Sequence, residues 1–432
     1  MILRENVWGL LGPEFLPSTR RTRTLGLGAS VRHFNDLAVP GLGGIWFGKQ
    51  TLLATLGVLV AEQARSNGVK VQNIEVANAI EALACWLAFK GNGWSSDPRL
   101  RGSVKLQGNS DDFSFARARQ RNFYVTQPMR MATTQALPAL GFVESESARF
   151  NAFRISEMGR VFVEDAFKGF KPYKRSVLDH LTMWVCGQDS RVSTDELRGA
   201  LSPLEPLAND ARPQFRERLI QGGQEDSEGR RRNALAWVET LRQAAPAQLD
   251  WSAKPQDLAE SHWQDLLAGA RFFRARDAAI QVLDTLEAHI GNQASGTTYS
   301  LLTDIPDVLV QPLHDLMTAA KEFISHRHAD MDACSFCHEC AGEGRSVLRS
   351  LVVRDGQVLR LIGDDVKPGP AFRGSETAGD EQDAEPADPP ATGSIPLPDG
   401  ISYRMHNLYL LNVDLHGKLS ELLHPDVDEG HP

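Results

Sequence analysis

Residues 122–167 restrict the possible folds most, because their apolar pattern switches between helix period and strand period. Apolar side chains recur at helical spacing over residues 127–140, and Gly141 ends that pattern. A strand-like segment, a polar turn, an alternating segment and a second helical segment follow at residues 142–144, 145–148, 149–155 and 160–167. We therefore expect a helix, a two-stranded hairpin and a further helix in this order.

Two runs in this stretch resemble the wing of bacterial winged-helix regulators: Leu140-Gly-Phe-Val-Glu and Phe153-Arg-Ile-Ser-Glu-Met-Gly-Arg-Val-Phe. Those regulators carry a leucine-glycine-aliphatic step, a polar wing tip and a leucine-threonine-x-x-glycine step before the last helix. The resemblance covers about residues 122–167 only, and it implies a winged helix-turn-helix domain. Many winged helices bind only proteins, and a helical hairpin is a third interpretation of the pattern.

If the domain binds duplex DNA, the resemblance implies two sets of contacts. The helix would present five side chains to base edges or phosphates in the major groove: Gln127, Arg130, Thr133, Thr134 and Gln135. Phosphates would be contacted by arginines on the wing and before it: Arg149, Arg154, Arg119 and Arg121. Pro138 lies inside the helix and is expected to shorten it.

Charge is distributed unevenly along the chain. The formal net charge of −9 argues against a protein that coats nucleic acid. Between residues 99 and 175, however, fourteen Lys and Arg are present against seven Asp and Glu. A basic segment inside an acidic chain favours nucleic-acid contact at that segment.

Three of the five cysteines lie in one short segment: Cys334, Cys337 and Cys340. Cysteines at this spacing can wrap a tetrahedral zinc ion, with one histidine as the fourth donor. His326, His328 and His338 are the candidates, and we take His328 as the ligand. An iron–sulfur cluster is the alternative, and it would need Cys85 or Cys186 as a further ligand. Reduced thiols along one helix, at positions i, i+3 and i+6, are the third interpretation.

Residues 43–50 match the first seven positions of a phosphate-binding loop, but Gln50 stands where the loop needs Ser or Thr. Such a loop must also follow a buried strand, and Pro40 makes the preceding segment a poor strand. A turn before a helix is therefore the expected structure. Two polar segments, residues 32–36 and 403–407, contain acid–base side chains but no recognisable catalytic motif.

The remaining pattern predicts a mainly α protein: a winged helix-turn-helix plus a helical domain, with a small C-terminal β-hairpin and a metal-binding knot. The expected divisions are an N-terminal helical and winged-helix domain, a helical domain, the knot with its hairpin, a disordered acidic linker and a docking segment, at residues 1–172, 173–325, 326–373, 374–400 and 401–432. The hairpin is expected within residues 346–362, with its turn at Asp355-Gly356. The docking segment is apolar and must pack on the body.

No apolar run is long enough to span a membrane, no secretion signal is recognised, and the cysteines are too few for a disulfide framework. These observations predict a cytoplasmic protein. The best-supported class is a DNA-interacting accessory or regulatory protein with a structural zinc site. A non-catalytic scaffold subunit of a multiprotein bacterial system, such as an antiviral phage-defence operon, is the first alternative. A nucleotide-dependent enzyme is the second.

Overall fold

The structure is a computed structural model that describes residues 23, 25–108, 113–222, 226, 228–244, 249–292, 298–374 and 395–424. The chain divides into two compact units, each combining segments that are distant in sequence. Unit 1 contains residues 1–31 and 271–378, and unit 2 contains residues 32–270 and 379–432. Helices make up 60% of the described residues and strands 4%, which confirms the prediction of a mainly α protein.

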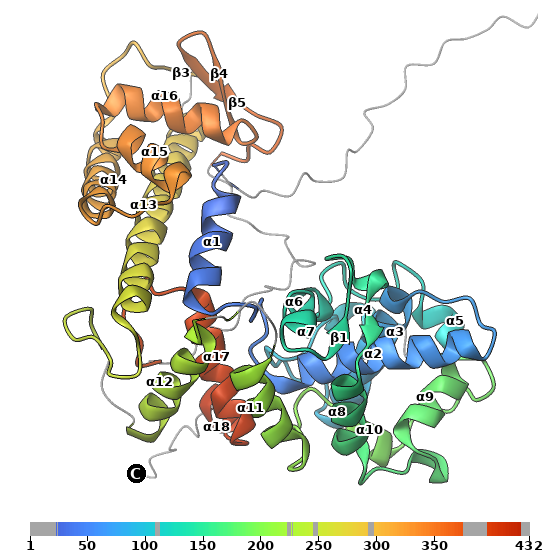
Figure 1. Ribbon diagram of the computed structural model, residues 1–432. Coiled ribbons are helices and arrows are strands. Elements are labelled where there is room, and N and C mark those ends of the chain that lie inside the picture. Colours follow the sequence, from blue (N-terminus) through green and yellow to red (C-terminus); the bar gives the residue numbers. More distant parts are fainter. Residues whose placement is uncertain are drawn as a thin grey trace, which may run out of the picture. The chain divides into compact units, whose positions relative to one another are not determined.

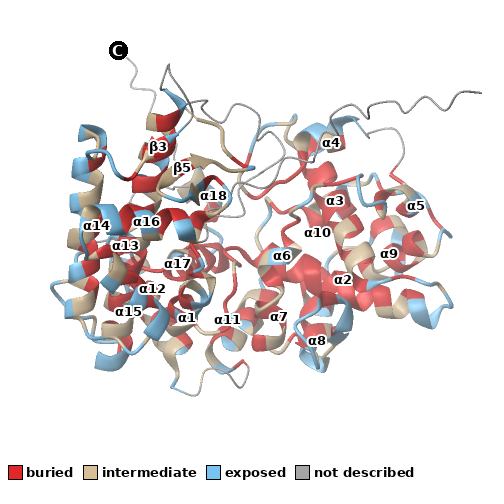
Figure 2. Cartoon of the chain, turned by 90° about the horizontal axis from the view of Figure 1, so that it is seen from above, coloured by how far each residue is buried: buried red, intermediate tan, exposed pale blue. Residues whose placement is uncertain are grey.

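Unit 2 is built on two long helices, α2 (Gly48–Ser66) and α3 (Asn73–Gly91), which pack along each other (Figure 1). α2 buries fifteen of its nineteen residues, and most of its length is coloured as buried in Figure 2. A helix that is apolar on all sides needs neighbours on all sides, so α2 lies at the centre of this unit. Gly57 allows the close packing, because a Cβ atom there would lie 2.6 Å from the Cα of Ala77.

Shorter elements complete unit 2. In chain order they are α4 (Ser103–Gly108), α5 (Phe115–Ala118), α6 (Arg130–Thr133), α7 (Ala136–Ala139), β1 (Val143–Glu144), the 3-10 turn η1 (Phe150–Ala152), β2 (Arg154–Ile155), α8 (Glu157–Phe167), the 3-10 turn η2 (Pro172–Lys174), α9 (Val177–Val185), α10 (Asp195–Leu201), α11 (Ala211–Gln221), α12 (Arg230–Ala244), α17 (Tyr403–Leu415) and α18 (Leu419–Leu423). α17 packs against α12 and α2 and buries eleven of its thirteen residues. The apolar C-terminal segment is therefore part of the core of unit 2.

Unit 1 contains α14 (Asp307–Ser325), α15 (Met331–Cys340), α16 (Gly344–Asp355) and a three-stranded antiparallel sheet of order β3-β5-β4. Its strands are β3 (Tyr299–Ser300), β4 (Leu359–Ile362) and β5 (Asp365–Pro368). Two helices, α1 (Gly28–Ala38) and α13 (Glu260–Gly291), contribute residues to both units.

The prediction of a hairpin at residues 346–362 is wrong. Residues 344–355 form α16, and Gly356 ends that helix with a left-handed φ of 62°. The hairpin lies later in the chain, where Gly363 helps to turn β4 into β5. The apolar residues within 347–353 have the composition of a strand, but Leu348, Leu351 and Val352 fit helical spacing as well. They form the buried face of α16.

None of the described helices is long and apolar enough to cross a membrane. The acidic linker predicted at residues 374–400 falls mostly on residues 375–394, which lie outside the described residues. Near its end, Leu397 is buried and belongs to the core of unit 2.

Candidate functional site

The hairpin predicted from residues 142–155 forms, and it lies between two helical segments of unit 2. β1 pairs with β2 in antiparallel register, Val143 opposite Ile155 and Glu144 opposite Arg154, and α8 follows. The helix expected at residues 127–140 is interrupted, because only α6 and α7 have helical hydrogen bonding. Pro138 has no N–H to donate to Thr134 one turn earlier, which accounts for the break.

The start of α8 explains the serine and glycine that carried the resemblance. Ser156 caps α8 by accepting a hydrogen bond from the Gly159 backbone N at 2.9 Å, and its hydroxyl donates to the Gly141 carbonyl at 2.7 Å. A Cβ atom on Gly159 would lie only 2.0 Å from the Phe142 carbonyl oxygen. Glycine at this position therefore lets α8 cross the hairpin at backbone contact distance.

One side of the hairpin is held on the core. The Asn73 side chain at the start of α3 donates to the Phe153 carbonyl at 2.8 Å. The Glu62 carboxylate of α2 accepts from the Ile155 backbone N at 2.7 Å. These contacts come from the two central helices, and Val143, Phe150 and Phe153 are buried, so the hairpin has a fixed inner side. Glu144, Arg149 and Arg154 are exposed on it.

The nine candidate DNA-contacting residues fall into two groups. Arg121, Arg149 and Arg154 are exposed, and Gln127 and Thr134 are partly exposed. Thr133 is fully buried, and its hydroxyl donates to the Arg130 carbonyl, so it cannot reach a duplex in this conformation. Gln135, Arg119 and Arg130 serve internal contacts: Gln135 bonds Asp36, Arg119 pairs with Glu75, and Arg130 bonds Asn78 and lies over the Phe150 ring.

Part of the positive charge between residues 99 and 175 is neutralised by carboxylates from outside that segment. Ion pairs join Arg99 to Asp97, Arg119 to Glu75 and Arg175 to Asp189. A linear count of charge misses such pairs, because the acidic partners lie elsewhere in the sequence. The basic surface is therefore smaller than the sequence count indicates.

The three cysteines of the predicted metal site lie on successive turns of α15. Cys337 and Cys340 are buried, and burial raises the pKa of the Cys340 thiol to about 12 and that of Cys337 further. The Cys334 thiol donates to the backbone carbonyl of His328. Within the described ranges, no three His, Cys, Asp or Glu side chains gather closely enough to hold a metal ion. The zinc site expected from the cysteine spacing therefore stays a prediction.

Residues 43–47 lead into α2 without forming a strand, and residues 48–50 are its first turn, in line with the turn before a helix expected from the sequence. No strand precedes α2 in the described part of the chain. The position where a phosphate-binding loop would hold its anion is taken by the Asp414 carboxylate of α17, which accepts from the Gly48 backbone N at 2.8 Å. Lys49 is buried, and its ammonium donates to the Ala200 carbonyl. These contacts leave neither the helix terminus nor the lysine free for a nucleotide.

The fold brings together the two polar segments that carried no recognisable motif. Asn35 accepts a hydrogen bond from the Ser402 hydroxyl at 2.6 Å. Arg404 bonds the Asp36 carboxylate with one nitrogen and the Gln135 amide oxygen with another, and Gln135 donates to Asp36 at 2.7 Å. Asp36, Gln135 and Arg404 thus form a closed polar triangle.

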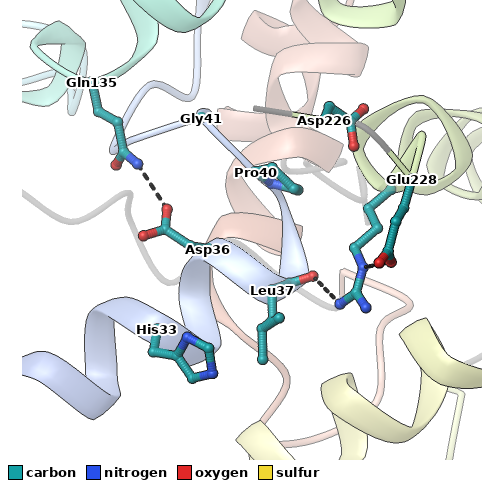
Figure 3. Close-up of a pocket in the computed structure, with 9 residues that line it drawn as sticks. His33, Asp36, Leu37, Pro40, Gly41, Gln135, Asp226 and Glu228 are labelled. Carbon is teal, nitrogen blue, oxygen red and sulfur yellow. Dashed lines mark hydrogen bonds and ion pairs between the residues drawn. The ribbon is translucent and has the colours of Figure 1, made fainter. Parts of the chain in front are cut away.

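A cleft of about 390 Å³ lies beside this triangle, between the end of α1 and the start of α12 (Figure 3). Asp36 and Gln135 lie on one side of it, and Asp226 and Glu228 on the other (Figure 3). Arg230 lines it as well. Sequence reasoning missed this site, because its residues come from three distant segments.

The chain matches no family model, no curated protein and no solved structure.

Proposed function

We propose that the protein binds duplex DNA through exposed arginines of the β1–β2 hairpin. The observation that carries the proposal is the placement of Arg149 and Arg154, which are both exposed on a hairpin whose inner side is held by Asn73 and Glu62. Cations on a fixed support can bind phosphates without first being ordered, which lowers the entropic cost of binding. Arg121 is a further exposed cation of the predicted set.

Binding should be weak and independent of DNA sequence. Glu144 and Glu146 are exposed on the same hairpin, and Glu146 lies 3.4 Å from Arg154, so they lower the positive potential there. Reading of base edges has less support, because Thr133 is buried and Gln135 is bonded inside the protein. The geometry therefore favours an accessory protein that contacts the DNA backbone over a sequence-specific regulator.

The test is a fluorescence titration of labelled duplex DNA at two salt concentrations. We expect the Arg149→Ala/Arg154→Ala variant to bind more weakly and to show a log K against log salt slope less steep by about two, because each lost phosphate contact removes about one unit. Arg274→Ala/Arg360→Ala is the matched control. Arg274 and Arg154 both have side chains 65% exposed and paired to one glutamate.

Two outcomes would contradict the proposal: no binding of folded protein at low salt, or equal loss of affinity in both double variants. Either would favour a scaffold that contacts a protein partner.

One observation supports that second function, contact with a protein partner. Six of the ten exposed large hydrophobic side chains among the described residues belong to unit 1, the smaller unit: Leu302, Val308, Val310, Met331, Val353 and Ile362.

A further inference from the structure

Exposed cations gather around the 3-10 turn η1 of the hairpin, beside the loop that joins α2 to α3. Arg149 immediately precedes η1. Arg65 lies in the last turn of α2, and Lys70 lies in the loop of residues 67–72. All three residues are exposed, and Arg65 and Lys70 are not among the residues that the sequence predicts to contact DNA.

A single side chain joins Arg65 to the hairpin. Arg65 Nη1 donates to Asn73 Oδ1 at 2.9 Å and to the Val71 carbonyl at 3.3 Å. Asn73 Nδ2 in turn donates to the Phe150 carbonyl at 3.2 Å and to the Phe153 carbonyl at 2.8 Å. The Arg65 guanidinium is therefore held one side chain away from the backbone of η1.

Lys70 is placed on the same surface by contacts of the residues that follow it. The Gln72 amide oxygen accepts from the Asn151 amide at 3.1 Å, and Asn151 Oδ1 accepts from the Ile74 backbone N at 2.9 Å. These bonds fix η1 against the start of α3. Lys70 and Arg149 each lie two residues from the Gln72–Asn151 contact, so their segments are adjacent.

In the described part of the chain, no carboxylate forms an ion pair with any of these three cations. The neighbouring carboxylates are engaged elsewhere: Glu75 pairs with Arg119, and Glu62 accepts from the Ile155 backbone N. Cations gathered in this way repel one another, and a bound anion relieves that repulsion. The surface around η1 therefore favours a negatively charged partner.

We propose that Arg65, Lys70 and Arg149 form one phosphate-binding surface, which extends the DNA contact from the hairpin to the α2–α3 loop. This inference rests on the proposed function and adds two residues to its site. Duplex DNA carries one negative charge per about 1.7 Å of its axis, so neighbouring cations can each neutralise a phosphate. None of the three has to give up an ion pair to do so, whereas Arg154 lies beside Glu146.

The test is a titration of labelled duplex DNA with the full chain at two salt concentrations. We expect Arg65→Gln/Lys70→Gln to bind more weakly, with a log K against log salt slope less steep by about two. Gln at position 65 keeps an N–H donor for Asn73, so the fold should be kept. Arg232→Gln/Lys168→Gln is the matched control, because it removes one exposed arginine and one exposed lysine elsewhere in unit 2.

A second variant separates lost charge from lost folding. The Lys70 side chain makes no hydrogen bond or ion pair within the described residues, so Lys70→Glu should leave the urea-unfolding midpoint unchanged. Its reversed charge should nevertheless weaken binding more than loss of the lysine charge alone does.

The outcomes distinguish this inference from the proposed function. If Arg65→Gln/Lys70→Gln and Lys70→Glu bind as the control does, the inference is overturned, while the hairpin proposal stands. Weaker binding of these variants, combined with wild-type binding by Arg149→Ala/Arg154→Ala, would contradict the hairpin proposal and still support phosphate contacts by Arg65 and Lys70. Absence of any binding by folded protein at low salt would overturn both.

Discussion

Replacing Asp414 on α17 tests how the C-terminal helix is held in unit 2. Its carboxylate accepts from the Gly48 backbone N at 2.8 Å, at the start of the central helix α2. Both groups are buried, and no water can replace the bond without a cavity. Asp414→Asn keeps an acceptor at this position, whereas Asp414→Ala removes it. The two variants lose the same charge and differ mainly in the hydrogen bond.

The expected difference follows from that comparison. Asp414→Ala leaves the Gly48 N–H buried without a partner at a helix N-terminus, which costs about 1–3 kcal/mol. We therefore expect Asp414→Ala to be less stable than Asp414→Asn by about 2 kcal/mol. Asp414→Asn itself should be more stable than the wild type at neutral pH, by up to about 3 kcal/mol, because the cost of burying the charge exceeds its attraction to Lys49 and the other nearby cations.

The pH dependence gives a second readout. Burial raises the pKa of Asp414 from 3.8 to about 6, although the Gly48 N–H and nearby cations favour the charged form. The folded state therefore binds this proton more tightly than the unfolded state. The contribution to stability is complete below about pH 3.8 and is lost as pH rises through about 6, a change of about 3 kcal/mol. Asp414→Asn should flatten the stability profile in this window.

Urea unfolding followed by tryptophan fluorescence measures both effects. Seven of the eight tryptophans lie within residues 32–270, so the signal reports on unit 2. Measurements at about pH 4.5 and about pH 7 cover the window in which Asp414 titrates. Equal stability of the Ala and Asn variants, or a wild-type profile as flat as that of Asp414→Asn, would refute this account of the α2–α17 contact.

Two further predictions concern the hairpin and the cysteines. Gly159→Ala should destabilise unit 2 by about 3 kcal/mol in the same assay, because its Cβ would collide with the Phe142 carbonyl, whereas Gly169→Ala, with nothing within 4 Å, should have little effect. Elemental analysis tests the metal: the cysteine spacing predicts about one zinc per chain, removal of which should destabilise unit 1. Absence of zinc and iron, with all five thiols of the chain titrating after unfolding, would instead support the α15 helix as described.

Local features of the fold could be predicted from the sequence because they depend on neighbouring residues. The step from β2 into α8 is one example, since Ser156 and Gly159 act within one helical turn. The sequence was ambiguous where one apolar pattern fits both a strand and a helix. Residues 346–353 have the composition of a strand and the spacing of a helix, and in the structure they belong to the helix α16.

The candidate cleft could not be predicted because its charges are placed by contacts across the whole chain. Arg404 reaches Asp36 across 368 positions and Gln135 across 269. One signal in the sequence did exist: an arginine among apolar residues in the docking segment must find an acceptor when that segment is buried. This requirement predicts that a partner exists, but every Asp, Glu and backbone carbonyl satisfies it equally. Only the packing of α17 in unit 2 selects Asp36, and with it the wall of the cleft.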